Sequence, residues 1–424
     1  MTFQGTALAF LFVYLSTIDR SLPRRETAGR RVSANVMALG AVSLVTDISA
    51  EMVVAVLPIY LVMGLSLSPA AYGAIDGLYT GATALLRLVG GYAADRTQRR
   101  KFVAGLGYGI SCVAKLGLLA AGRSVGLIGA VIAVDRAGKG LRTAPRDAMI
   151  TLSTPPDDLG RAFGIHRTMD SIGAFLGPLV AMAVLWLAAD SFDAVFVASF
   201  CIAALAVVVL VLFVRDRRET LSGAQPVVVR SIGTLISAPG VLRLVAAAIL
   251  LGLATIGEGF VYLLLQDRQD LSLVWFPLLA VGSNLAFLLL ATPLGILADR
   301  VGRLPVMLAG YVALALAYLA LLLPGGWALL VIVLLLNGTF YAATDGVLMA
   351  LAGGILPTGL RTTGIAMVQT GQALAYLGSS VLFGLAWTFW GQLVALTGAA
   401  GMVAITVIAT TVLLRRPRQT ADAR

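Results

Sequence analysis

The sequence predicts an all-α membrane protein, on two observations of composition and one of pattern. Of its 424 residues, 59% are hydrophobic and only 12% are charged, whereas soluble domains carry about 25% charged residues. Apolar segments of the roughly 20 residues that a transmembrane helix needs follow one another along the chain. We therefore expect twelve transmembrane helices. Their predicted ranges are 34–64, 71–94, 102–121, 125–148, 162–188, 193–214, 241–265, 272–298, 304–323, 326–352, 362–389 and 391–414.

The basic residues lie on one side of these predicted helices. They gather after each even-numbered helix, whereas the other connections hold only Arg123 and Arg268. Because positively charged connections stay in the cytoplasm, both chain ends are expected to be cytoplasmic, with the protein in the inner (plasma) membrane. The net charge of +10 therefore indicates orientation in a bilayer and not a surface that binds nucleic acid. The residues that define the pattern are Arg96, Arg99, Arg100 and Lys101; Arg161; Arg215, Arg217, Arg218 and Arg230; Arg300 and Arg303; Arg361; and Arg415, Arg416 and Arg418.

Metal and cofactor sites are not expected. The chain has two cysteines, Cys112 and Cys201, both in apolar segments, and a single histidine, His166. These numbers exclude a disulfide framework and a multi-histidine metal site. The sequence has no Walker loop, so we expect no cofactor and no ATP-driven pumping.

The chain is predicted to consist of two similar halves. GYAADRTQRR after the second helix recurs as GILADRVGR after the eighth, and Ala50–Glu51 has a counterpart at Gly257–Glu258. Arg161 and Gly164 of GRAFG likewise match Arg361 and Gly364 of LRTTG. Internal repeats are common in secondary transporters, whose substrate site lies between the repeats. The expected parts are a cytoplasmic tail (1–32), a six-helix bundle (33–215), a cytoplasmic linker (216–238), a second six-helix bundle (239–415) and a cytoplasmic tail (416–424).

Two loop motifs identify a family resemblance. The pattern G-x-x-x-D-[RK]-x-G-[RK]-[RK] is approximated twice, with Gln98 at the place of a glycine in the first copy. The chain thus resembles the major facilitator superfamily over residues 34–414, which implies a monomeric secondary transporter of a small molecule, with the fold of two pseudo-symmetric six-helix bundles. The motif positions are Gly91, Asp95, Arg96, Arg99 and Arg100 in the first copy and Gly295, Asp299, Arg300, Gly302 and Arg303 in the second.

Two weaker motifs concern direction and coupling. Arg136-Ala-Gly-Lys139-Gly140 is similar to the R-x-x-Q-G pattern of proton-coupled drug antiporters, with lysine in place of glutamine. Gly173, Gly177 and Pro178 match the antiporter pattern G-x-x-x-G-P without its trailing glycines. The resemblance therefore implies export of a small organic solute in exchange for protons, within a bacterial subgroup marked by GKGLRTAPRDA.

Charged residues collect on the helices that line the central cavity in this family, the first, fourth, seventh and tenth. A charge at the bilayer centre costs at least about 2.5–3.5 kcal/mol, so such residues are expected to face water or protein. The other mid-helix charges are Asp76, Arg87, Lys115 and Asp170. The candidate cavity residues are Asp47, Glu51, Asp135, Arg136, Lys139, Arg142, Glu258, Asn337 and Asp345.

The sequence leaves the roles of these charges open. Asp47 and Glu51 lie four residues apart and repel each other when both are ionised, so one of them could bind the coupling proton. Alternatively both could form structural salt bridges with the cations of the fourth helix, or contact substrate. Arg136, Lys139 and Arg142 could bind an anionic substrate, because guanidinium groups match carboxylates and phosphates, or could only neutralise the acids.

A second group of residues is expected at the cytoplasmic gate. By resemblance, Gly91, Asp95, Arg96 and Arg100 clamp the halves together in the outward-open state, with Arg146 or Asp147 as partners. Gly295, Asp299, Arg300 and Arg303 form the matching group of the second half. Gly173, Gly177 and Pro178 are expected to allow close helix packing and a bend. His166, four residues before Asp170, is interpreted as a packing residue, with a pH-sensing role open.

Three function classes compete on this sequence. A proton-coupled exporter is preferred, and a proton-coupled importer of an anionic metabolite is the nearest alternative. A membrane-embedded transferase would need a magnesium-binding acidic cluster, and Asp157-Asp158 lacks a third carboxylate at suitable spacing. A sensor that keeps the transporter fold without flux is the third class. We expect a protein that is not an enzyme, with substrate, protons and the bilayer as its partners.

Overall fold

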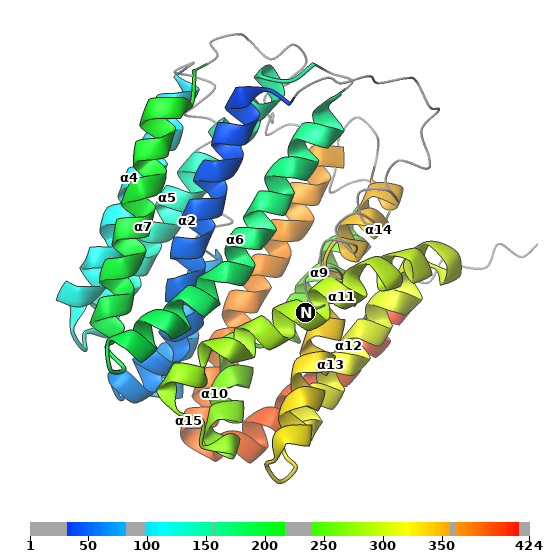
Figure 1. Cartoon of the computed structure of the whole chain (residues 1–424). Coiled ribbons are helices and arrows are strands. Elements are labelled where there is room, and N and C mark those ends of the chain that lie inside the picture. The colour runs from blue at the N-terminus through cyan, green and yellow to red at the C-terminus, as the bar shows by residue number, and fades with distance from the viewer. Residues whose placement is uncertain (1–31, 82–98, 156–157, 217–239, 357–360, 415–424) are drawn as a thin grey trace, which may run out of the picture.

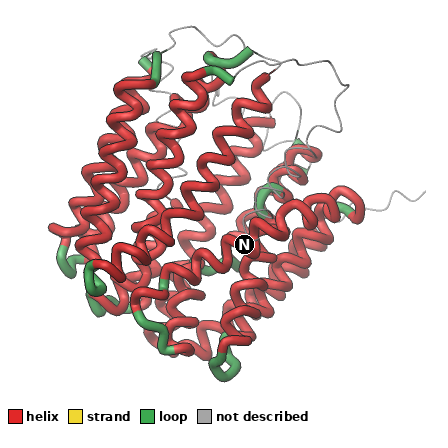
Figure 2. Tube along the Cα trace, viewed as in Figure 1, coloured by secondary structure: helices red, strands yellow, loops and turns green. Residues whose placement is uncertain are grey.

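The structure is a computed structural model that describes residues 32–81, 99–155, 158–216, 240–356 and 361–414. Within these ranges the regular structure is helical and no strand occurs (Figure 2). In a bilayer this is the expected solution, because a helix satisfies its backbone hydrogen bonds internally and lipid offers none.

The first half of the chain forms five long helices and part of a sixth. Serine side chains begin three of them, because each accepts a hydrogen bond from a free N–H in the first turn: Ser33 from the N–H of Asn35, Ser124 from that of Leu127 and Ser191 from that of Ala194. The elements are α2 (Ala34–Ile59), its π-helical extension η2 (Tyr60–Gly64), a helix over residues 69–81, α4 (Arg100–Ala121), α5 (Val125–Leu152), α6 (Leu159–Leu187) and α7 (Phe192–Phe213).

The second half differs from the prediction in where its helices break. The predicted seventh helix is interrupted at 254–257 and the tenth at 345–346. The predicted boundary between the eleventh and twelfth helices, at residue 390, is confirmed by a kink at Gly391, whose φ is 81°. The elements are α9 (Val241–Leu253), α10 (Glu258–Gln269), the 3₁₀ turn η4 (Leu273–Trp275), α11 (Pro277–Val301), α12 (Arg303–Ala320), α13 (Trp327–Thr344), α14 (Val347–Ile355) and α15 (Arg361–Leu414).

Among the described residues, nine helical stretches are long and apolar enough to cross a membrane. α5 is outside that set although it has 28 residues, because it carries six charged side chains between Asp135 and Asp147. The charged side chains of α5 must therefore be kept from lipid by the neighbouring helices.

Packing pairs repeat between the halves. α2 packs against α6 and α4 against α5; correspondingly, α9 packs against α15 and α12 against α13. In Figure 1 the helices α2 and α4 to α7 stand together, and α9 and α11 to α14 form the neighbouring group. We call the face where α2 begins, at the top of Figure 1, the terminal face, and the other end of the helices the opposite face.

The two groups meet closely at the opposite face. There the helix over 69–81 runs along α15, and its glycines allow backbone contact. A Cβ atom on Gly77 would lie 2.9 Å from the carbonyl oxygen of Leu377, and one on Gly384 would lie 2.5 Å from that of Pro69. The N–H of Ala70 donates to Oγ1 of Thr388 (3.0 Å).

Candidate functional site

The acidic pair on α2 faces α6. A Cβ atom on Gly173 would lie 3.1 Å from the Cβ of Asp47, and one on Gly177 would lie 2.5 Å from the Cβ of Glu51. The two glycines thus let α6 approach α2 at the levels of the two carboxylates. Pro178 is buried inside α6 directly after Gly177.

Lys139 is the cation that acts on both of these acids. Its charge interacts with Asp47 and with Glu51, and all three side chains are half-buried. Among the described residues, none of the three forms an ion pair at bonding distance. Asp47, Glu51 and Lys139 therefore make a group of nearby charges without fixed partners.

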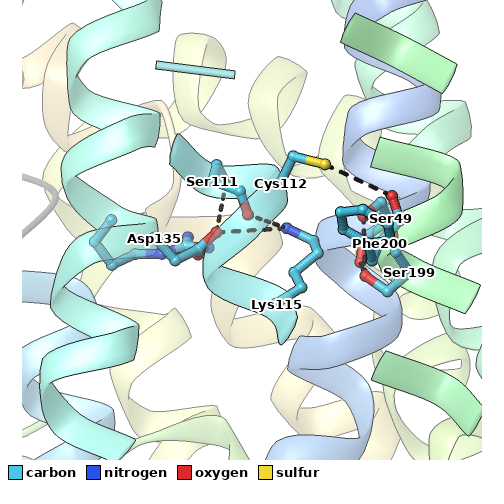
Figure 3. A network of polar contacts seen from close by, with 8 residues as sticks. Ser49, Ser111, Cys112, Lys115, Asp135, Ser199 and Phe200 are labelled. Carbon is cyan, nitrogen blue, oxygen red and sulfur yellow. Dashed lines mark hydrogen bonds and ion pairs between the residues drawn. The ribbon is translucent and has the colours of Figure 1, made fainter. Parts of the chain in front are cut away.

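Asp135 and Arg136 belong to a separate polar cluster on α4 and α5, and Figure 3 shows Asp135 beside Ser111 and Lys115. Nε of Arg136 donates to Oδ2 of Asp135 (2.9 Å), Nζ of Lys115 lies 3.4 Å from Oδ1, and the hydroxyl of Ser111 also donates to that oxygen. The guanidinium group of Arg136 lies 3.9 Å above the ring of Tyr79. In this cluster the side chains of Ser111, Lys115 and Arg136 all contact the Asp135 carboxylate. The cluster is part of the packing between α4, α5 and residues 69–81.

A small cavity adjoins this cluster. Its volume is about 20 Å³, and Tyr79, Lys115, Asp135 and Arg136 contribute to its lining together with apolar residues of α2 and α5. This is room for about one water molecule. It is too small for an organic solute.

Arg142 packs against α4. It is 3% exposed, and its guanidinium group lies 4.6 Å from the ring centre of Tyr108 on α4, an arrangement that stabilises a cation by the ring's quadrupole. Of the three cations predicted to share one function on α5, Lys139 alone has neither a carboxylate nor a ring as a described partner.

The second half contributes an acid with hydrogen-bond partners. Glu258 is the first residue of α10, directly after the break, and accepts from Nδ2 of Asn337 (2.9 Å) and from the hydroxyl of Tyr262. Asn337 also donates to Oγ of Ser283 (3.2 Å), which joins α10, α11 and α13. The charges of Glu258 and Glu51 act on each other across the two halves. Two residues predicted for the cavity, Glu258 and Asn337, are thus in direct contact.

Asp345 is placed differently. It lies at the break between α13 and α14 and is exposed, eight residues or about 12 Å of helix beyond Asn337. The structure therefore separates it from the Glu258 cluster.

The predicted gate residues are described only in part. Gly91, Asp95 and Arg96 lie outside the described residues. Arg100 is 1% exposed at the start of α4. Arg146 pairs with Asp147 (3.0 Å) and donates to Oγ of Ser43 on α2 (3.1 Å), so both stay within the first half.

The second motif copy lies on the surface. The Arg303 guanidinium lies 3.9 Å from the Asp299 carboxylate, and both side chains are exposed. Arg300 is exposed as well, and a Cβ atom on Gly295 would meet nothing within 4 Å. The Asp299–Arg303 ion pair is thus a surface contact within the second half.

Asp76 is a site residue that sequence reasoning left without a role. Oγ of Ser380 on α15 donates to its Oδ2 (2.7 Å), the hydroxyl of Tyr72 donates to Oδ1 (3.4 Å), and its carboxylate also lies against Gly257 at the break of the seventh span. One carboxylate of the first half thus contacts two elements of the second. The sequence signal was a charge on a helix with glycines at 73, 77 and 81, a spacing typical of tight helix contacts.

Comparison with known proteins agrees with this architecture. The family model described as Major Facilitator Superfamily matches residues 39–285 and 275–424. An uncharacterised MFS-type transporter of Methanocaldococcus jannaschii is 29% identical over 391 residues, which is 90% of this chain and 95% of that protein. An uncharacterised protein of Mycobacterium bovis is 31% identical over 126 residues, or 29% of this chain and 31% of that protein.

Solved transporter structures share the fold. The nucleoside transporter NupG superposes with a TM-score of 0.77 at 15% identity, over 90% of this chain and 99% of that one. The peptide transporter POT in complex with sulfate gives 0.73 at 16% identity, over 94% and 97%. At these identities the likeness concerns the arrangement of helices alone.

Proposed function

Because the chain belongs to the major facilitator superfamily, and is therefore a multi-pass membrane transporter and not an enzyme, we propose that it is a proton-coupled exporter of a small organic solute. The observation that carries this proposal is the unpaired group Asp47, Glu51 and Lys139 between α2, α5 and α6. Carboxylates without fixed partners can bind either a proton or a solute.

Coupling follows from competition for the same charges. When Asp47 and Glu51 are both ionised, these two carboxylates attract Lys139 and any cationic part of a solute. A proton on Asp47 or Glu51 removes one negative charge and weakens that attraction. If proton and solute favour different conformations, each shifts the equilibrium between them, and exchange results.

The alternative, import of an anionic metabolite, is less well supported by the contacts. Arg136 is bonded to Asp135, and the buried Arg142 is stacked on Tyr108. An anion near the acidic pair of α2 would therefore meet Lys139, which has two carboxylates beside it. We rank the exporter first for this reason.

The remaining proposals concern orientation and gating. We infer from the distribution of basic residues that the terminal face is cytoplasmic, in the plasma membrane, with both chain ends on that side. Residues 33–215 and 239–415 are proposed to act as the two moving bundles of a monomer, joined by the linker 216–238. Gly91, Asp95, Arg96 and Arg100 are proposed to close the cytoplasmic side, together with Arg146 or Asp147, in the state opposite to the one described.

Flux in proteoliposomes tests the function. We expect movement of at least one solute from a metabolite and drug panel to depend on an imposed pH gradient. The variant Lys139→Met should lower the gradient-driven rate about tenfold or more, as loss of a group that assists proton transfer does, while folding and insertion are retained. Lys101→Met is the matched control, because Lys101 contacts the backbone of Val211 at the terminal face. Unchanged flux in Lys139→Met would remove the fourth helix from the mechanism, and no gradient dependence for any solute in the wild type would contradict the exporter.

A further inference from the structure

Two buried polar atoms on α6 have no hydrogen-bond partner among the described residues: Nε2 of His166 and Oδ1 of Asp170. His166 is 4% exposed, and its Nδ1 lies 3.8 Å from Oδ2 of Asp170, one helical turn further along. Leaving such buried atoms without a hydrogen bond is unfavourable, because they lose their contact with water. Two such atoms in neighbouring side chains indicate a place where a proton or a water molecule can bind.

His166 and Asp170 lie along the same α2–α6 contact as the acidic pair of α2. Asp47 lies against Gly173, three residues beyond Asp170, and Glu51 lies against Gly177. Residues four apart on a helix are separated by about 6 Å along its axis. Glu51, Asp47, Asp170 and His166 therefore follow one another in short steps along the seam between α2 and α6, from the middle of the bundle toward the terminal face.

Three cations of α5 face this seam, because Lys139, Arg142 and Arg146 all act on Asp47. Arg146 on α5 is held by Ser43, one turn before Asp47, and its charge acts on Asp170. The groups acting on His166 are Arg146, Asp147, Asp47 and Arg167. α7 and α11 also pack against α6, and their charged residues in the described part lie at helix ends: Asp193 on α7, and Asp299 and Arg300 on α11.

We propose that the seam between α2 and α6 conducts protons between Asp47 and the terminal face, with Asp170 and His166 as the carriers. The inference rests on the proton coupling proposed above and assigns its route. In each step one proton is released and one is bound: Asp47 passes its proton to Asp170, through one water molecule, and Asp170 passes a proton to Nδ1 of His166. Nε2 then releases its proton toward the terminal face. An imidazole ring suits this role because it can bind a proton at one nitrogen and release one from the other.

The single histidine makes the route testable without a known solute. Protein carrying ¹⁵N-histidine and a purification tag without histidines would give the imidazole signals of His166 alone, which are followed by NMR against pH in lipid nanodiscs. In Asp47→Asn and in Asp170→Asn we expect the titration midpoint of His166 to move by about 0.3 pH unit or more, because each removes a nearby charge. Asp190→Asn, in an exposed connection, is the control and should leave the midpoint in place. A midpoint that Asp47→Asn changes by less than that amount would overturn the route.

Flux measurements separate this inference from the proposed function. His166→Gln keeps a polar side chain but removes the titrating group, so pH-gradient-driven flux should fall about tenfold or more. Exchange of labelled for unlabelled solute at equal pH needs no net proton movement and should persist. Gradient-driven flux at the wild-type rate in His166→Gln would refute the route while the exporter stands. Absence of gradient-driven flux in the wild type would refute the exporter and the route together.

Discussion

At the scale of single residues, three of the four cations of α5 show how strongly the partner of a charged side chain determines its role. Arg136 has a carboxylate and an aromatic ring, Arg142 has a ring, and Lys139 interacts with Asp47 and Glu51 at longer range. Burial of a matched pair is tolerated, whereas removal of one partner leaves a charge without compensation. Arg136 and Arg142 therefore contribute to helix packing, whereas Lys139 is available for function.

Asp135→Asn tests this distinction. The change would leave Lys115 and Arg136, 3% exposed each, without their counter-ion, and loss of one partner of a buried pair costs about 3–5 kcal/mol. We expect a marked fall in the thermal unfolding temperature of the purified protein in detergent. Asp47→Asn, which breaks no described ion pair, should change that temperature little. Equal unfolding temperatures for the two variants would contradict the assignment of Asp135 to packing.

At the scale of helices, the seam between α2 and α6 depends on residues without side chains. A helix association in lipid gains nothing from the hydrophobic effect, so close packing of small residues supplies the attraction. Gly173 and Gly177 serve this role, and they also bring α6 to the level of the acidic pair. Packing and chemistry thus use the same two positions.

Gly177→Ala should destabilise the protein although alanine favours helices. The new Cβ would lie 2.5 Å from the Cβ of Glu51 and 2.9 Å from the carbonyl oxygen of Ile48, and overpacking costs about 1–3 kcal/mol. Gly401→Ala, on α15 with nothing within 4 Å, is the matched control and should be neutral or stabilising, because alanine is favoured by about 1 kcal/mol over glycine in a helix. Thermal unfolding compares the two; equal effects would mean that α2 and α6 can move apart without loss.

The sequence predicted the helices well where hydrophobicity decides and poorly where packing decides. Apolar length and the internal repeat indicated each span. The break before Glu258 was not predicted, because apolar residues continue on both sides of it. The turn at Gly391 lies at the predicted boundary between the eleventh and twelfth helices. Arg136 and Lys139 are three residues apart and were assigned one face, yet Tyr79 and Ser111, on other helices, determine where Arg136 packs.

At the scale of the whole molecule, the contacts between the halves are concentrated at the opposite face. Tyr72 of the first half stacks edge-on against Phe260, which contacts Phe383 in the same way (4.7 and 4.8 Å between ring centres). Asp76 adds its bond to Ser380. Such a contact was out of reach of sequence reasoning, since it joins residues 304 positions apart. Alternating access requires these contacts to separate once in every cycle.

A reversible cross-link between Ala70 and Thr388 tests this requirement. With Cys112→Ala and Cys201→Ser as background, Ala70→Cys and Thr388→Cys should form a disulfide, because the backbone N–H of one residue now donates to the side chain of the other. We expect the oxidised protein to lose solute flux in proteoliposomes and to regain it on reduction. The control pair Asp267→Cys and Gln392→Cys joins two residues of the second half that are hydrogen-bonded at 2.9 Å. Its oxidation should leave flux intact; full activity of the cross-linked 70–388 pair would mean that this face never opens.

The charges of α5 also bear on how the chain can reside in lipid at all. Each charged residue at the centre of a lone helix costs about 2.5–3.5 kcal/mol on insertion, and α5 carries several. Lys115 of α4 lies 3.4 Å from Asp135, and α4 and α5 are consecutive, joined by the short connection at 122–124. The helical hairpin of α4 and α5, rather than either helix, is therefore the smallest portion of this region whose electrostatics are compatible with a membrane interior.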